Sequence, residues 1–189
     1  MNSRSSHPQW AHQVWLAGLV VGVSALSFVF ACATPFAAFA VLAAMTLSRP
    51  DAIRTTVALW MLNQVIGYGV LGYPRTVSSV TWGLAIGIAA VSCTLVARLI
   101  IRRLSTARGL IRTAVALGGT FAVYEAALFT VAVAGLGGTG SFAAPIVGRV
   151  LAINVAAFAG LYALHRIGFA VGIGRPPAIA KTRPRLPVS

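Results

Sequence analysis

Acidic side chains are almost missing from this sequence, and charged residues of any kind are few. Asp51 and Glu125 are the two acidic residues, and Asp, Glu, Lys and Arg together make up 9% of the 189 residues. A soluble domain has about 25%. Because 58% of the residues are hydrophobic, the chain could not cover a soluble surface. The shortage of carboxylates also argues against a metal-dependent membrane enzyme, since such sites need several acidic or histidine ligands.

Cysteine and catalytic motifs are equally scarce. Cys32 and Cys93 lie far apart and have no metal-ligand pattern around them, so neither a disulfide framework nor a zinc site is predicted. The motifs HExxH, GxSxG and the P-loop do not occur. We therefore expect a protein that is not an enzyme, has no cofactor and does not hydrolyse ATP by itself.

Long apolar segments dominate the rest of the chain. A transmembrane helix needs roughly 20 mostly apolar residues, and six segments qualify: Gln13–Ala31, Thr34–Ser48, Ala52–Tyr73, Ser79–Ile101, Arg112–Leu136 and Pro145–Val171. The second is short, so a tilted or partial span is expected there. The sequence predicts an all-α integral membrane protein with a six-transmembrane-helix bundle at 13–173. A cytoplasmic N-terminal segment at 1–12 precedes it, and a basic, proline-rich cytoplasmic tail at 174–189, expected to be disordered, follows it.

The basic residues lie mainly on one side of this six-span arrangement. Thirteen of the 15 Lys and Arg residues fall on that side, and Arg75 and Arg149 fall on the other. The positive-inside rule then places both termini in the cytoplasm of a multi-pass protein of the cell inner membrane. We interpret the net charge of +13 as a topology signal and an attraction for anionic lipid, not as a nucleic-acid surface.

Polar side chains from three different spans share one level in the outer half of the predicted bundle. At about 1.5 Å per residue, Asn63 lies roughly 15 Å and Glu125 roughly 16 Å below the outer ends of their spans. A charge at this depth is costly, so Glu125 is expected to pair with Arg149 or to face water. The sequence therefore predicts an outward-facing pocket formed by Asn63, Gln64, Tyr68, Trp82, Tyr124, Glu125, Arg149 and Asn154.

Structural roles compete with this interpretation of the polar residues. Asn and Gln often join transmembrane helices by hydrogen bonds without binding a ligand. A buried Glu–Arg pair can be purely structural, and Tyr or Trp can belong to the aromatic belt at the membrane interface. Small residues four apart, Gly18 and Gly22 in the first span and Gly83 and Gly87 in the fourth, let helices approach closely. Such pairs predict internal packing or, at Gly18 and Gly22, a surface for a partner.

Three pieces of the run from Thr34 to Gly87, TPFAAFAVLAAMTLSRPDA, WMLNQVIGYGVLGYP and WGLAIG, resemble a known transporter family. They are similar to the substrate-binding S components of energy-coupling-factor vitamin transporters, of the solitary cobalamin (BtuM-like) type. The resemblance implies uptake of cobalamin or a related corrinoid bound near the outer face. It also implies docking through Gly18 and Gly22 on a membrane module with ATPases, or action without that module. A thiolate can ligate a corrinoid cobalt, and topology favours Cys32 for this role.

Two classes of function follow from the sequence. The first is a transport protein that binds a vitamin in an outward-facing pocket and moves it inward. The second is an accessory or structural membrane subunit without a small-molecule ligand. A cavity in the outer half favours the first, and a filled outer half favours the second.

The charge distribution leads to a test of topology. Because thirteen basic residues lie on one side, a reporter fused to the C-terminus should report a cytoplasmic location. Fusions in the connections after residues 73 and 136 should report the opposite side. A C-terminal fusion that is active only outside the cytoplasm would contradict the six-span arrangement and the depth estimates that rest on it.

Overall fold

The computed structural model describes residues 13–14, 16–18, 20–22 and 34–170, and these residues form helices without any strand. The residues described between 13 and 22 are helical, inside the first predicted span. The other elements are α2 (Phe36–Thr46), α3 (Arg49–Gly69), α4 (Val77–Arg103), α5 (Gly109–Val131), the π-helical turn η1 (Ala132–Leu136), the 3-10 turn η2 (Thr139–Phe142) and α6 (Ala144–Ala170). The all-α class is therefore confirmed. The segments 1–12 and 174–189 and Cys32 lie outside the described residues.

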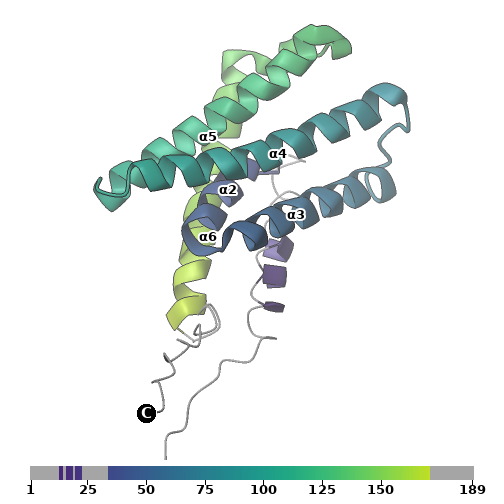
Figure 1. Ribbon diagram of the computed structural model, residues 1–189. Coiled ribbons are helices and arrows are strands. Elements are labelled where there is room, and N and C mark those ends of the chain that lie inside the picture. Colours follow the sequence, from purple (N-terminus) through teal and green to yellow (C-terminus); the bar gives the residue numbers. More distant parts are fainter. Residues whose placement is uncertain (1–12, 15, 19, 23–33, 171–189) are drawn as a thin grey trace, which may run out of the picture.

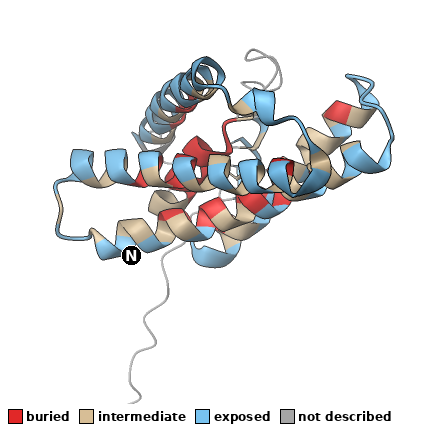
Figure 2. Ribbon diagram, turned by 90° about the horizontal axis from the view of Figure 1, so that it is seen from above, coloured by how far each residue is buried: buried red, intermediate tan, exposed pale blue. Residues whose placement is uncertain are grey.

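The short helix α2 lies at the centre of the fold. Its first eight residues, Phe36 to Ala43, are all buried, with exposed fractions of 0–2%. It contacts α3, α4, α5 and α6, and Figure 2 shows the buried residues gathered where these helices meet. Because every side of α2 is covered, an apolar sequence without helical periodicity is what this position requires.

The other helices are arranged around α2 in two directions. α3, α4 and α5 lie side by side, joined by the connections at 70–76 and 104–108, and α6 crosses them steeply (Figure 1). The connections at 70–76 and at 132–143 are therefore at the opposite end of α4 from Arg102 and Arg103. This gives the bundle an arginine-rich end and an end without a cluster of basic residues.

Local sequence signals explain where the helices begin. The Ser48 Oγ accepts a hydrogen bond from the Asp51 backbone N–H at 3.3 Å and donates one to the Asp51 carboxylate at 2.7 Å, which caps α3. The Thr76 Oγ1 caps α4 by accepting from the Ser79 N–H at 3.2 Å. Since this cap places Arg49 and Pro50 in the first turn of α3, the helix begins three residues before the predicted Ala52. It also ends at Gly69, before the predicted Tyr73.

Three described helices are long and apolar enough to cross a membrane: Val77–Arg103, Gly109–Leu136 and Ala144–Ile167. The 11 residues of α2 give a length of about 17 Å, whereas the hydrocarbon core is about 30 Å thick. The second predicted segment is therefore not a full span. Six full spans are not established, because α2 is too short and α3 combines a charged first turn with the amides of Asn63 and Gln64.

The outward faces of the long helices are apolar. On α4, the side chains of Leu84, Ile88, Leu95 and Leu99 are exposed and follow one face of the helix. Soluble monomers rarely expose an apolar surface of this extent. The exposed stripe and the three long apolar helices are compatible with a protein surrounded by lipid.

The glycine pair of α4 is used for internal packing, as predicted for small residues four apart. A Cβ at Gly87 would lie 2.6 Å from the Trp60 ring of α3, and a Cβ at Gly83 would lie 2.5 Å from the Gln64 Oε1. The Trp60 Nε1–H donates to the Gly83 carbonyl at 2.8 Å. The two glycines thus allow α3 side chains to lie directly on the α4 backbone.

We expect Gly87→Ala to destabilise the protein by about 1–3 kcal/mol, since the added methyl group overlaps the Trp60 ring. Gly118→Ala is the matched control, because a Cβ on that α5 glycine would meet no atom within 4 Å. Thermal unfolding in detergent measures both effects. Equal unfolding temperatures for the two variants would show that the α3–α4 contact does not depend on Gly87.

Candidate functional site

A cavity of about 400 Å³ lies at the end of the bundle opposite Arg102 and Arg103. Its walls come from the residues before and at the start of α2, the C-terminal half of α3, the first turns of α4, the end of α5, η2 and the start of α6. Four of the eight predicted pocket residues line it: Asn63, Trp82, Tyr124 and Glu125. The structure therefore brings together residues from α3, α4 and α5 that are up to 62 positions apart in the sequence.

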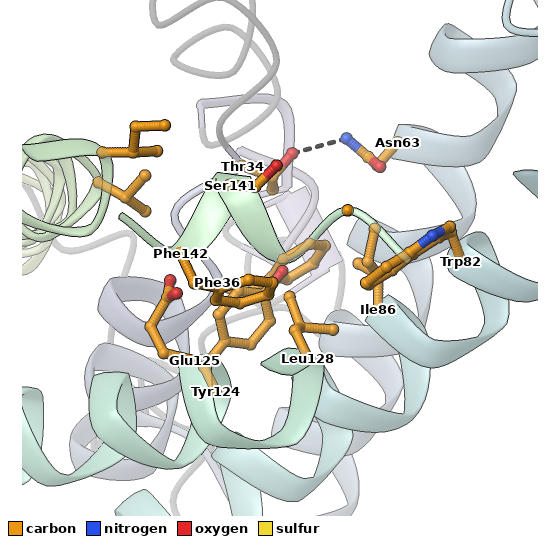
Figure 3. A pocket seen from close by; sticks show the side chains of 13 residues that line it. Thr34, Phe36, Asn63, Trp82, Ile86, Tyr124, Glu125, Leu128, Ser141 and Phe142 are labelled. Atoms are coloured by element: carbon orange, nitrogen blue, oxygen red, sulfur yellow. Dashed lines mark hydrogen bonds between the residues drawn. The ribbon is translucent and has the colours of Figure 1, made fainter. Parts of the chain in front are cut away.

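Aromatic rings form much of the cavity wall. Figure 3 shows Phe36, Tyr124 and Phe142 near Glu125, with Trp82 on the α4 side. The rings of Phe36 and Tyr124 are 6.1 Å apart and tilted by 38°. Such a wall can cover the apolar surface of a flat or bulky ligand.

Glu125 supplies the carboxylate of this cavity. Its side chain is half-buried, and no hydrogen bond or ion pair joins it to another described residue. The predicted partner, Arg149, is exposed on α6 and does not line the cavity. The expected Glu125–Arg149 ion pair is therefore absent among the described residues, and α6 contributes Ile146 and Val150 to the cavity wall instead.

Asn63 lines the cavity and also forms hydrogen bonds with other residues of the protein. Its Nδ2 donates to the Thr34 Oγ1 at 2.6 Å (Figure 3), and its Oδ1 accepts from the Gln64 Nε2 at 3.4 Å. The carbonyl of Thr34 in turn accepts from the Phe36 N–H at 2.8 Å. Asn63 thus holds the residue that leads into α2 while it borders the cavity.

Asn154 does not line the cavity, contrary to the prediction. It is buried, with 3% of its surface exposed, and its Oδ1 accepts from the Ala38 backbone N–H at 3.1 Å. Its Nδ2 donates to the Val150 carbonyl at 3.0 Å. The first N–H groups of a helix have no acceptor within that helix. Asn154 of α6 supplies a hydrogen-bond acceptor to one of these groups at the buried start of α2.

Gln64 and Tyr68 also lie outside the cavity lining. The Gln64 side chain lies against Gly83 of α4, and the Tyr68 hydroxyl is 3.1 Å from the Ser79 Oγ. Both residues join α3 to α4, as do Thr56 and Thr94, whose hydroxyls are 2.8 Å apart. Gln64 and Tyr68 therefore agree with the structural alternative, in which polar side chains join neighbouring helices without binding a ligand.

The remaining predicted positions have separate surroundings. Cys93 is buried, and its thiol donates to the Thr120 carbonyl at 3.5 Å, as expected of a small buried side chain. Gly18 is exposed, and a Cβ added at Gly22 would lie 3.8 Å from the Leu164 Cδ2 of α6. Among the described residues no group of three His, Cys, Asp or Glu side chains could hold a metal ion.

Several apolar residues of the cavity wall were not predicted, because an apolar residue in an apolar helix gives no signal of a binding site. Ile86 follows Trp82 by four positions and Leu128 follows Glu125 by three, so helical spacing from the predicted residues could have found both. Ser141 and Phe142 lie in the glycine-rich connection, which gave only a turn signal. Their contribution depends on how that connection folds back over α5, where Phe142 meets Phe129 at a ring distance of 5.2 Å.

Comparison with known protein families, curated proteins and solved structures gives no match for this chain. The function must therefore be inferred from the chemistry of the cavity and of the sequence itself.

The contact between Asn154 and α2 predicts a loss of stability without any ligand. Asn154→Leu leaves the buried Ala38 N–H without an acceptor and should lower the free energy of unfolding by about 1–3 kcal/mol. Thr130→Val is the control, because it removes an exposed bond within α5. Unfolding in detergent at increasing denaturant measures both. An Asn154→Leu protein as stable as the control would contradict the structural role of this amide.

Proposed function

We propose that this protein is a membrane vitamin-uptake protein, which binds cobalamin or a related corrinoid in the cavity beside α2 and moves it inward. The observation that carries the proposal is the cavity itself, in which aromatic walls surround the amide of Asn63 and the carboxylate of Glu125. Small-molecule sites are typically mostly apolar concavities with a few placed polar groups. A corrinoid offers both surfaces, since its apolar ring edges carry amide side chains.

The position of the cavity supports an outward opening. The cavity is lined in part by the connection at 137–142, and Arg102, Arg103 and Arg108 lie at the other end of α4. The positive-inside rule assigns the arginine end to the cytoplasm. A ligand from outside would then meet the cavity first.

The cavity volume limits how much of a corrinoid can enter. Cavities of about 300–1,000 Å³ enclose drug-sized ligands, and a complete cobalamin is larger than such a ligand. At about 400 Å³ the cavity accepts one edge of a corrinoid with its amide groups, and the rest of the molecule stays outside unless the wall moves.

The connection at 137–142 is the part of the wall best suited to such a movement. Gly138, Ser141 and Phe142 of this connection line the cavity. It follows the π-helical turn η1, and the φ angles of Gly135, Gly137 and Gly138 are 130°, 74° and 81°. Glycine is the residue that adopts such angles without strain, and π-helical turns often occur at functional sites.

One observation favours the accessory-subunit alternative. Asn63, Gln64 and Asn154, three of the polar residues that suggested a pocket, each contact other residues of the protein. Their presence in the sequence can therefore be explained by helix packing alone. This explanation does not cover Glu125, because no hydrogen bond or ion pair joins its carboxylate to another described residue.

Growth on external B12 tests the proposal. In a strain that needs B12 and lacks its own importer, expression of this chain should restore growth at low B12, and the purified protein should bind cyanocobalamin. Ile86→Trp fills the cavity and should weaken binding roughly tenfold or more. Ile88→Trp, the same change on the exposed face of α4, should leave binding unchanged. Glu125→Gln, which removes the charge at nearly constant volume, should also weaken binding.

The outcomes separate the two candidate functions. Binding that is lost in Ile86→Trp and kept in Ile88→Trp, at equal unfolding temperatures, places the ligand in the cavity. Absence of both growth and corrinoid binding in the unaltered protein contradicts the proposal and leaves the accessory subunit as the better interpretation.

A further inference from the structure

A second hollow lies at the arginine-rich end of the bundle, between the end of α2, the start of α5 and α6. It consists of two adjoining cavities of about 510 and 320 Å³ that share Met45 and Tyr162. Arg112, Leu110 and Phe158 line the first, and Arg166 lines the second. We call this region the arginine groove, and it has no residue in common with the cavity beside α2.

Among the described residues, neither Arg112 nor Arg166 forms an ion pair with a carboxylate. Both acidic side chains of the protein lie elsewhere: Asp51 is 3.6 Å from Arg54 at the start of α3, and Glu125 lines the cavity at the opposite end. The Arg112 Nε is buried and has no hydrogen-bond partner among the described residues. A buried donor without a partner is costly, so an acceptor from outside the chain would stabilise this arrangement.

The lining of the groove indicates what kind of anion fits. Guanidinium groups bind phosphate through paired hydrogen bonds. Leu110, Met45 and Phe158 add an apolar wall that an inorganic anion would not use. Tyr162, stacked on Phe158 at a ring distance of 5.9 Å, is of the type enriched at membrane interfaces. An amphiphile with a phosphate head and an acyl chain matches both parts.

We infer that the arginine groove binds an anionic phospholipid, with the headgroup phosphate at Arg112 and Arg166 and an acyl chain along Leu110, Met45 and Phe158. Basic pockets between transmembrane helices are suited to lipid headgroups. This site is independent of the ligand of the cavity beside α2, so failure of one proposal leaves the other standing.

Lipid binding by the full-length protein in detergent tests the inference. Phosphatidylglycerol should be retained in native mass spectrometry and should raise the unfolding temperature, whereas phosphatidylcholine should do neither. Arg112→Gln with Arg166→Gln should weaken phosphatidylglycerol binding by about fivefold per arginine. Arg75→Gln, which removes one charge in the exposed connection before α4, is the control with which the fivefold effect of each single arginine is compared.

Each alternative outcome overturns the inference. Equal binding of the two lipids would indicate apolar contact alone, and an equal effect of Arg75→Gln would indicate attraction by net charge. Inorganic phosphate that stabilises the protein as well as the lipid would indicate a site for a soluble anion. If the double variant does not fold, Arg166→Gln alone is sufficient, because this side chain is exposed and its loss should weaken phosphatidylglycerol binding without lowering stability.

Discussion

The rest of the structure depends on how the buried start of α2 obtains hydrogen-bond partners. This helix is covered on every side, so water cannot satisfy its first backbone N–H groups. The Thr34 carbonyl accepts from the Phe36 N–H, and the Asn154 side chain accepts from the Ala38 N–H. Asn63 holds Thr34 by its hydroxyl. Asn63 of α3 and Asn154 of α6 thereby both bind the start of α2 by hydrogen bonds. These bonds give the two polar residues a structural role in otherwise apolar helices.

The cavity lies beside this point, and the two features share residues. Thr34 and Phe36 line the cavity and also form the entry to α2, while Asn63 borders the cavity and bonds Thr34. A ligand that competes for the Asn63 amide would therefore act on the start of α2. Glu125 is different, because no hydrogen bond or ion pair with another described residue accounts for it. It is the residue whose presence most directly favours a ligand over packing alone.

The two ends of the bundle differ in chemistry because the chain carries 15 basic and two acidic side chains. At the end with the connections at 70–76 and 137–142, the Glu125 carboxylate lies near the rings of Phe36, Tyr124 and Phe142. At the other end, Arg112 and Arg166 border a groove with apolar walls. This difference between the two ends suits the two proposals. The end with Glu125 would face the side that supplies the ligand, and the end with Arg112 and Arg166 would face anionic lipid headgroups.

Composition and hydropathy determined the helical class and the approximate bounds of α4, α5 and α6, because these depend on local sequence. The distribution of Lys and Arg along the chain likewise indicated which end of the bundle is rich in arginine. The sequence also indicated Asn63, Trp82, Tyr124 and Glu125 as neighbours, since depth along a helix follows from residue number. Only the tertiary structure decided which way each side chain points. It turned Gln64 and Tyr68 toward α4, Asn154 toward α2 and Arg149 outward, because rotation about the helix axis is fixed by packing against other helices. It likewise made the 11-residue α2 a buried centre, because that position needs apolar residues on every side, a pattern that sequence alone cannot distinguish from a membrane span.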